Sequence, residues 1–314
     1  MTPSSKEHQQ TELRWLEIIA DYRCNNRCIG CYSVMDDGPS MDRGAIVKAL
    51  HVGRTGGASR LWLGGGEPTL RRDMFWMVKR ARKMGFTHVK LQTNGMLLAY
   101  PKFAARCAES GVTEACFAIK GATARTHDAL TATPGCHELM ERGIVEALRA
   151  GLHVTGDILV YEDNTEEILE MVRHYAGMGV SRFSIWLLCS TDAGKELWSQ
   201  VPRISEVVPH ITRAMDLGLS PDPGFIVSLH TPPCTVPESH HDCLFQAADL
   251  GLLVANPGDH YFKLETSPIE GGLFLDRCDD CRHRSRCNGM RRDYVAIHGN
   301  SEFCPRPDQI GPLD

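Results

Sequence analysis

The stretch CNNRCIGCY, residues 24 to 32, places three cysteines at C-x3-C-x2-C spacing, after the apolar run LEIIA (16–20). Closely spaced thiolates are typical ligands of zinc and of iron–sulfur clusters. A structural zinc ion takes four protein ligands, whereas three cysteines on a four-iron cluster leave one iron free to bind another molecule. The spacing predicts a metal centre held by Cys24, Cys28 and Cys31, with a zinc site completed by a remote ligand as the alternative.

Short apolar runs alternate with helical patterns from residue 13 to about 217. The later strand-like runs are RLWLGGGEP, VKLQTNG, EACFAIKG, LHVTGDILVY and RFSIWLLC. Six strand–helix cycles predict an α/β fold, a parallel sheet that right-handed crossovers curl into a partial (β/α)6 TIM-like barrel. Chemistry in such barrels lies at the carboxyl ends of the strands. The cysteine stretch, the GGGEP turn (64–68) and the QTNG turn (92–95) all fall there.

The ends of the chain differ in character from this barrel. Residues 1–12 are a polar tail, and residues 218–314 are rich in proline and poor in helix signals. Six of the 13 cysteines lie in the last 81 residues. We therefore expect residues 218–314 to form a small cysteine-rich module that a metal centre stabilises.

Composition excludes several classes of protein. The 314-residue chain has a net charge of −5, which gives no general attraction to nucleic acid or to an anionic membrane. The N-terminus has no apolar signal segment, and no apolar run is long enough for a transmembrane helix. We expect a cytoplasmic protein, and in that reducing compartment 13 cysteines indicate metal binding or catalysis rather than disulfides.

C-x3-C-x2-C followed by an aromatic residue, after the first strand of a partial barrel, resembles the radical S-adenosylmethionine (SAM) superfamily. In that family the open iron of a [4Fe–4S] cluster chelates the amino and carboxylate groups of SAM. An electron from the cluster breaks the sulfonium bond, giving methionine and a 5′-deoxyadenosyl radical that abstracts hydrogen from a substrate. The resemblance implies that SAM itself is the ligand of the iron that the three cysteines leave free.

Later landmarks resemble the same family in the expected order. The GGGEP turn implies contact with the methionine end of SAM through Gly65 and Gly66, which lack side chains. Glu67 would hold the SAM ammonium group or brace the turn. The other positions that the resemblance assigns to the cofactor are Tyr32, Asn94, Lys120, His127 and Asp157.

The stretch CDDCRHRSRCNGMRRDYVAIHGNSEFCP (278–305) resembles the auxiliary-cluster region of the SPASM and twitch subfamilies. This implies a second [4Fe–4S] cluster with three ligands in one short segment, Cys278, Cys281 and Cys287. Arg291 stands where the fuller pattern has another cysteine, so one auxiliary cluster is expected rather than two. Cys304 is favoured as the fourth ligand over Cys234, and further alternatives are Cys243, His240 and His241. A structural zinc ion is the alternative to this cluster.

Catalytic groups beyond the cofactors are not singled out by the sequence. Side chains near predicted strand ends can accept a proton if the reaction is an oxidation, and these are Asp21, Asp157, Tyr161, Cys189 and Asp192.

The resemblance implies an enzyme, an oxidoreductase or a peptide-modifying maturase, that acts on a peptide or protein segment or on a small biosynthetic intermediate. The auxiliary cluster would aid oxidation or position the substrate, and a flavodoxin or ferredoxin would supply electrons. Twelve residues before the first strand cannot form a leader-binding extension, which shifts weight toward a small molecule, an exposed peptide or a separate recognition partner. The alternatives are a dehydrogenase or methyl-transfer enzyme of small-molecule biosynthesis and, in another class, a non-catalytic iron–sulfur or zinc scaffold or sensor.

Overall fold

The computed structural model describes residues 12–31, 39–189, 195–220, 222–267 and 270–305. Its centre is a nine-stranded sheet in the order β7-β6-β5-β4-β3-β2-β1-β8-β9. Neighbouring strands are parallel except for the antiparallel pair β8 and β9. The strands are β1 (Trp15–Ile19), β2 (Arg60–Gly64), β3 (His88–Thr93), β4 (Glu114–Ile119), β5 (His153–Val160), β6 (Phe183–Leu187), β7 (Ile226–Leu229), β8 (Leu252–Asn256) and β9 (His260–Lys263).

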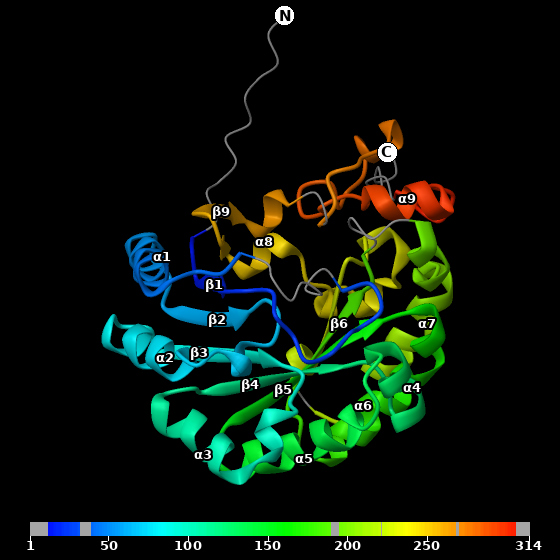
Figure 1. The fold of residues 1–314 in the computed structure, drawn as a ribbon. Coiled ribbons are helices and arrows are strands. Elements are labelled where there is room, and N and C mark those ends of the chain that lie inside the picture. The colour runs from blue at the N-terminus through cyan, green and yellow to red at the C-terminus, as the bar shows by residue number, and fades with distance from the viewer. Residues whose placement is uncertain (1–11, 32–38, 190–194, 221, 268–269, 306–314) are drawn as a thin grey trace, which may run out of the picture.

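Helices cover the outer side of this sheet, which curves into the expected partial TIM-like barrel (Figure 1). The cysteine-rich segment and the last helix, coloured orange to red in Figure 1, lie above the barrel. Within the described residues, no helix is both long enough and apolar enough to cross a membrane. The α-helices are α1 (Arg43–Thr55), α2 (Met74–Lys83), α3 (Pro101–Ser110), α4 (Ala124–Thr131), α5 (Cys136–Arg149), α6 (Ile168–Gly177), α7 (Ile204–Met215), α8 (Ala247–Leu250) and α9 (Arg292–His298).

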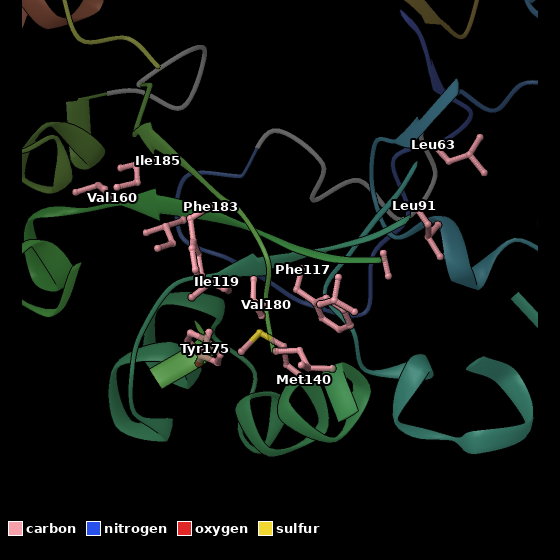
Figure 2. Close-up of a cluster of buried hydrophobic side chains, with 14 of the residues drawn as sticks. Leu63, Leu91, Phe117, Ile119, Met140, Val160, Tyr175, Val180, Phe183 and Ile185 are labelled. Atoms are coloured by element: carbon pink, nitrogen blue, oxygen red, sulfur yellow. The ribbon is translucent and has the colours of Figure 1, made fainter. Parts of the chain in front are cut away.

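The main core lies between the outer face of the sheet and these helices. Successive strand residues point to opposite faces, so every second residue of a strand faces the helices. Figure 2 shows apolar side chains along the strands, with Phe117 and Ile119 facing Met140 of α5 and Tyr175 of α6. These strand residues are at most 3% exposed: Leu63, Leu91, Phe117, Ile119, Val160, Phe183 and Ile185.

The inner face of the barrel carries charged side chains, which the same alternation places there. Glu17 of β1, Gln92 of β3 and Asp157 of β5 line the inner cavity. Lys90 of β3 is buried and 3.8 Å from Asp157. The barrel interior therefore carries charged groups among apolar side chains, whereas the core beneath the helices is apolar.

Three strands come from the part of the chain after residue 217. β7 pairs with β6 at one edge of the sheet, and β8 pairs with β1 at the other. The sequence analysis did not anticipate these strands. They extend the six-stranded barrel at both edges, so residues 226–263 contribute to the barrel as well as leading into the cysteine-rich segment.

Candidate active site

A cavity of about 340 Å³ lies at the carboxyl ends of the barrel strands. Residues that directly follow β2 to β7 contribute to its lining, as expected for a barrel of parallel strands. Cys24, Cys28 and Cys31 all line this cavity. They lie in the segment that follows β1, which we call the cysteine loop, residues 20–31. Tyr32, predicted as a cofactor residue, lies outside the described residues.

Arg71 fastens the cysteine loop to the barrel. Its buried guanidinium donates hydrogen bonds to the carbonyls of Ala20 at 3.2 Å and Met41 at 3.0 Å. It also pairs with Asp21 at 3.2 Å, and Asp21 pairs with Arg23 at 2.7 Å. Asp21, predicted as a proton acceptor, thus contacts two arginines and is not among the described residues that line the large cavity.

The GGGEP turn packs backbone to backbone on the cysteine loop. The Gly66 amide donates to the Asp21 carbonyl at 3.1 Å, and the Glu67 amide donates to the Arg23 carbonyl at 2.7 Å. A Cβ atom on Gly65 would lie 2.7 Å from the Asp21 carbonyl oxygen, and one on Gly66 would lie 2.1 Å from that of Arg23. Side chains at these two positions would separate the turn from the loop, and both glycines face the cavity.

Glu67 joins the GGGEP turn to the QTNG turn. One carboxylate oxygen accepts hydrogen bonds from the Thr69 amide at 3.0 Å and the Thr93 hydroxyl at 2.9 Å. The other accepts from the Asn94 amide at 2.7 Å. Burial raises the pKa of Glu67, and these hydrogen bonds oppose that effect. The geometry therefore corresponds to the bracing role that the sequence left open for Glu67.

Asn94 and Lys120, both predicted cofactor residues, lie beside the cysteines. The Asn94 amide group donates to the Asn25 side chain at 2.7 Å, and its nitrogen lies 3.9 Å from the Cys24 sulfur. Lys120 is 7% exposed, and within the described part of the chain its ammonium group has no hydrogen bond or ion pair. Burial alone would lower the pKa of Lys120, but Cys28 and other nearby acidic groups raise it above its ordinary range.

His127 and Tyr161 support the backbone around the cavity. The His127 Nδ1 atom accepts the Lys120 backbone amide at 3.3 Å. Burial, followed by the charge of Lys120, lowers the pKa of His127 to about 3, so the imidazole is neutral. Tyr161, predicted as a catalytic candidate, donates to the Ile29 carbonyl at 3.0 Å and thereby holds the cysteine loop.

Three carboxylates form what we call the acidic wall of the cavity: Glu17, Asp157 and Glu270. Sequence analysis missed Glu17 and Glu270. A charged residue inside an apolar strand, as in WLEII, signals an inward position, but Glu270 follows β9 and no local pattern marks it. Burial raises the pKa of Glu17 to about 7, against the opposing charge of Lys90.

Cys189 and His230 lie next to the acidic wall. The Cys189 sulfur is 3.6 Å from His230 Nδ1, and His230 Nε2 is 3.0 Å from Glu270. Burial alone would lower the pKa of His230, but Cys189 and Glu270 outweigh it and raise the pKa to about 10. His230 follows β7 and Glu270 follows β9, so their pairing joins the two edges of the sheet. Asp192, another catalytic candidate, lies outside the described residues.

The donor set around the cysteine loop consists of three thiols, which are the usual ligands of iron–sulfur clusters. Across the described residues, no three His, Cys, Asp or Glu side chains converge closely enough to hold one metal ion. The three thiols instead surround shared space in the cavity, next to the unpaired ammonium of Lys120. Three separated thiolates with a buried cation beside them suit a multi-iron cluster and an anionic group bound near it.

A second group of cysteines surrounds a smaller cavity of about 30 Å³. Cys278, Cys281 and Cys287 line it, as the sequence predicted, and Cys234 lines it with them. Cys304 is exposed, and its backbone amide hydrogen-bonds the Cys234 sulfur. The structure thus brings Cys234 together with the three short-spaced cysteines, whereas the Cys304 side chain does not line their cavity.

The other predicted alternatives lie outside the described lining of this cavity, although His241 packs against two lining residues, Pro233 and His283. His240 pairs with Asp216 at 2.9 Å, and His241 lies 3.0 Å from the Pro233 carbonyl oxygen. Cys243, His240 and His241 are absent from the described lining of the small cavity.

Arg291 has a structural role at the position where a two-cluster pattern would have a cysteine. Its guanidinium is buried and donates to the carbonyls of Leu187 at 3.0 Å and Leu188 at 2.6 Å, at the end of β6. It also pairs with Asp293 at 2.8 Å. Arg291 therefore ties the cysteine-rich segment to the rim of the barrel.

The chain is similar to known proteins in sequence and in fold. The sequence model of the radical SAM superfamily matches residues 18–232. A probable GTP 3′,8-cyclase of Saccharolobus islandicus is 25% identical over 201 residues, covering 63% of this chain and 64% of that protein. An AdoMet-dependent heme synthase of Oleidesulfovibrio alaskensis is 29% identical over 137 residues, covering 44% of this chain and 35% of that protein. The match thus spans less than two thirds of either relative.

Solved structures share the fold at low sequence identity. Streptococcus suis SuiB bound to S-adenosylmethionine has a TM-score of 0.70 at 12% identity, covering 94% of this chain and 77% of that one. The structure of anSMEcpe with AdoMet and the Cp18Cys peptide has a TM-score of 0.59 at 13% identity, covering 93% of this chain and 92% of that one.

Proposed function

The chain belongs to the radical SAM superfamily, and from this premise we propose that it is an enzyme that reductively cleaves SAM and abstracts hydrogen from a substrate in the barrel. When bound, the [4Fe–4S] cluster and SAM of this family supply an electron and a 5′-deoxyadenosyl radical. One observation carries the proposal: Cys24, Cys28 and Cys31 face the same cavity as Gly65 and Gly66 of the GGGEP turn.

The residues around the cysteines have distinct roles in this proposal. Cys24, Cys28 and Cys31 hold the cluster, and the backbone of Gly65 and Gly66 lies close to the methionine end of SAM. Lys120 pairs with an anionic group there, because its buried ammonium has no other hydrogen-bond or ion-pair partner within the described residues. These assignments follow from which side chains line the cavity and which of them lack partners.

A second iron–sulfur cluster is proposed in the small cavity. Its ligands are Cys278, Cys281, Cys287 and Cys234, since these four line the same space. The cluster would accept an electron from the substrate or position it, and a flavodoxin or ferredoxin would reduce the cluster at the cysteine loop.

The substrate lies against the side of the cavity that Asp157, Cys189 and His230 line. Peptide-bound relatives of the same fold support a peptide substrate, while the cyclase and heme-synthase relatives support a small biosynthetic intermediate. The reaction belongs to the oxidoreductase or maturase type in either case.

Anaerobic reconstitution tests the proposal. Reconstituted protein given SAM and dithionite should release 5′-deoxyadenosine, and the triple variant Cys24→Ala, Cys28→Ala, Cys31→Ala should release none. The triple variant should keep about half of the iron if both clusters are four-iron cubes. Absence of cleavage by fully loaded wild-type protein, with or without substrate mixtures, would favour a non-catalytic scaffold.

A further inference from the structure

We propose that the acidic wall of the cavity, Glu17, Asp157 and Glu270, binds a cationic group of the substrate, an ammonium or a guanidinium. The inference rests on the proposed function in one respect: it takes the cavity beside the cysteine loop to be where the substrate binds. It adds the chemical class of one substrate group, which the proposed function leaves open.

The first observation concerns the carboxylate of Glu17. This group lines the cavity, and within the described residues it makes no hydrogen bond and no ion pair. The Glu17 side chain packs against Gly64 of the neighbouring strand β2. A Cβ atom at position 64 would lie 2.3 Å from Glu17 Oε1, so the glycine makes room for the carboxylate. The carboxylate therefore lies over β2 with its hydrogen-bonding capacity unused.

Asp157 supplies the second, independent observation. It is 6% exposed, and its Oδ2 atom accepts from Gln92 at 2.9 Å and lies 3.8 Å from the Lys90 ammonium. Its Oδ1 atom is buried and has no hydrogen-bond partner among the described residues. A buried carboxylate oxygen that lacks a hydrogen-bond donor costs free energy. A donor from a bound molecule would satisfy the Asp157 Oδ1 atom.

The charges around the wall leave a negative surplus. Lys90 is engaged by Asp157 and by the ring of Trp62, 3.9 Å from its centroid. His230 is engaged by Glu270 at 3.0 Å. Arg291 also lies beside His230 and acts on Glu270, but it is paired with Asp293 at 2.8 Å. Glu17 is therefore the carboxylate of the wall that has no hydrogen bond or ion pair among the described residues, and it attracts a further cation.

Trp186 adds a wall suited to an organic cation. Its ring lies in an edge contact with His230, and its Nε1 atom is buried without a hydrogen-bond acceptor among the described residues. An indole face attracts cations, and a free indole N–H can donate to an acceptor next to the cationic group. The arrangement therefore fits an amine or guanidine that carries an oxygen nearby.

Binding of matched probes tests the inference without requiring turnover. The reconstituted full-length protein is titrated by calorimetry at pH 8 with hexylammonium, hexanol and hexanoate, which share one alkyl chain. We expect hexylammonium to bind on the order of tenfold or more tightly than hexanol, and hexanoate not to bind. Equal affinity for the three probes, or preference for hexanoate, would overturn the inference.

A pair of variants assigns the effect to the wall. Glu17→Gln should weaken hexylammonium binding on the order of tenfold and leave hexanol unchanged, because the variant removes only the charge. Glu17 makes no hydrogen bond, so this substitution should not disturb folding. Glu138→Gln, on the exposed surface of α5, is the matched control and should change neither affinity. Unchanged hexylammonium affinity in Glu17→Gln would contradict the assignment.

The same titration repeated with saturating SAM separates substrate from cofactor. Retained hexylammonium binding supports a substrate subsite, whereas competition with SAM would overturn it. A five-residue peptide with one lysine distinguishes the two sources of an ammonium group: tighter binding of the peptide indicates a lysine side chain, tighter binding of hexylammonium a free amine. Release of 5′-deoxyadenosine is measured separately, so failure of the ammonium preference with intact SAM cleavage refutes only this inference.

Discussion

The Tyr161 hydroxyl donates a hydrogen bond of 3.0 Å to the carbonyl of Ile29, which lies between Cys28 and Cys31 in the cysteine loop. Tyr161 directly follows β5, and its side chain is fully buried. The end of the fifth strand therefore helps to set the position of two of the proposed cluster ligands.

Replacement of Tyr161 by Phe should loosen the loop while preserving the fold. Loss of one such hydrogen bond lowers the free energy of unfolding by about 1 kcal/mol. The carbonyl of Ile29 would lose its donor, so the reconstituted variant should release iron to a chelator several-fold faster than the wild type. Iron release is followed by absorbance under anaerobic conditions.

Tyr175→Phe is the matched control for this change. Tyr175 is also fully buried and donates to a backbone carbonyl outside the cysteine loop, that of Gly121 at 2.9 Å, and its hydroxyl lies 3.2 Å from His137 Nε2. It should show a similar loss of stability with wild-type iron release from the cysteine loop. Equal release rates in both variants would show that the Tyr161 hydrogen bond does not position the loop.

Glu67→Gln should act mainly by lowering the free energy of unfolding. The amide replaces one of two oxygens that both accept hydrogen bonds, including one from the Asn94 amide. Loss of charge-assisted hydrogen bonds predicts a decrease of roughly 1.5–3 kcal/mol in the free energy of unfolding. Glu109→Gln, on the exposed face of α3, should leave stability unchanged. Wild-type stability of Glu67→Gln with weakened SAM affinity would instead indicate direct contact with SAM.

The barrel was predictable because its signals are local. Each of the first six strands is a short run rich in apolar residues, and a helical pattern follows it, so sequence alone places the cysteine loop and the GGGEP turn at one end of the sheet. Strands β7 and β9 have only four residues each and lie among prolines, glycines and turns, so they carry no comparable signal. Their positions depend on pairing with strands distant in sequence.

The acidic wall could not be predicted from the sequence for the same reason. Glu17 and Glu270 are more than 250 residues apart in the chain, and only the closure of the sheet brings them to one cavity. The cysteine loop, in contrast, concentrates its three thiols within eight residues, so spacing alone identified them. Local motifs were therefore readable from sequence, whereas substrate-facing groups contributed by separate strands were not.

Iron content should identify the fourth ligand of the second cluster. Cys234 lines the small cavity and the exposed Cys304 does not, so Cys234→Ala should lose the auxiliary iron and destabilise the cysteine-rich segment. Cys304→Ala should retain its iron, because only its backbone amide contacts the Cys234 sulfur. Cys243→Ala is the control for loss of a nearby thiol. Loss of iron in Cys304→Ala, with iron retained in Cys234→Ala, would instead identify Cys304 as the fourth ligand, as the sequence favoured.

The stability of the protein should depend on pH through Glu17. Burial raises the pKa of Glu17 from 4.5 to about 7; Lys90 opposes this, and Asp157 and Glu270 reinforce it. A carboxyl group with a raised pKa stabilises the folded state below its unfolded pKa, and that contribution is lost as the pH rises through about 7. Relative to the wild type, Glu17→Gln should therefore have equal stability near pH 4.5 and gain up to about 3 kcal/mol at pH 8.

Urea denaturation of both proteins at several pH values between 4.5 and 8 measures this difference, with Glu138→Gln as the surface control. The gap should open mainly between pH 4.5 and pH 7, where Glu17 is ionised in the unfolded chain but still protonated in the folded protein, and it should be constant at higher pH. Ionisation of Glu17 in the folded protein, centred near pH 7, prepares the acidic wall for a cation, so hexylammonium affinity should rise between about pH 6 and pH 8 in the wild type and stay flat in Glu17→Gln. A pH-independent gap between the two proteins would mean that Glu17 keeps an ordinary pKa and is solvated within the cavity.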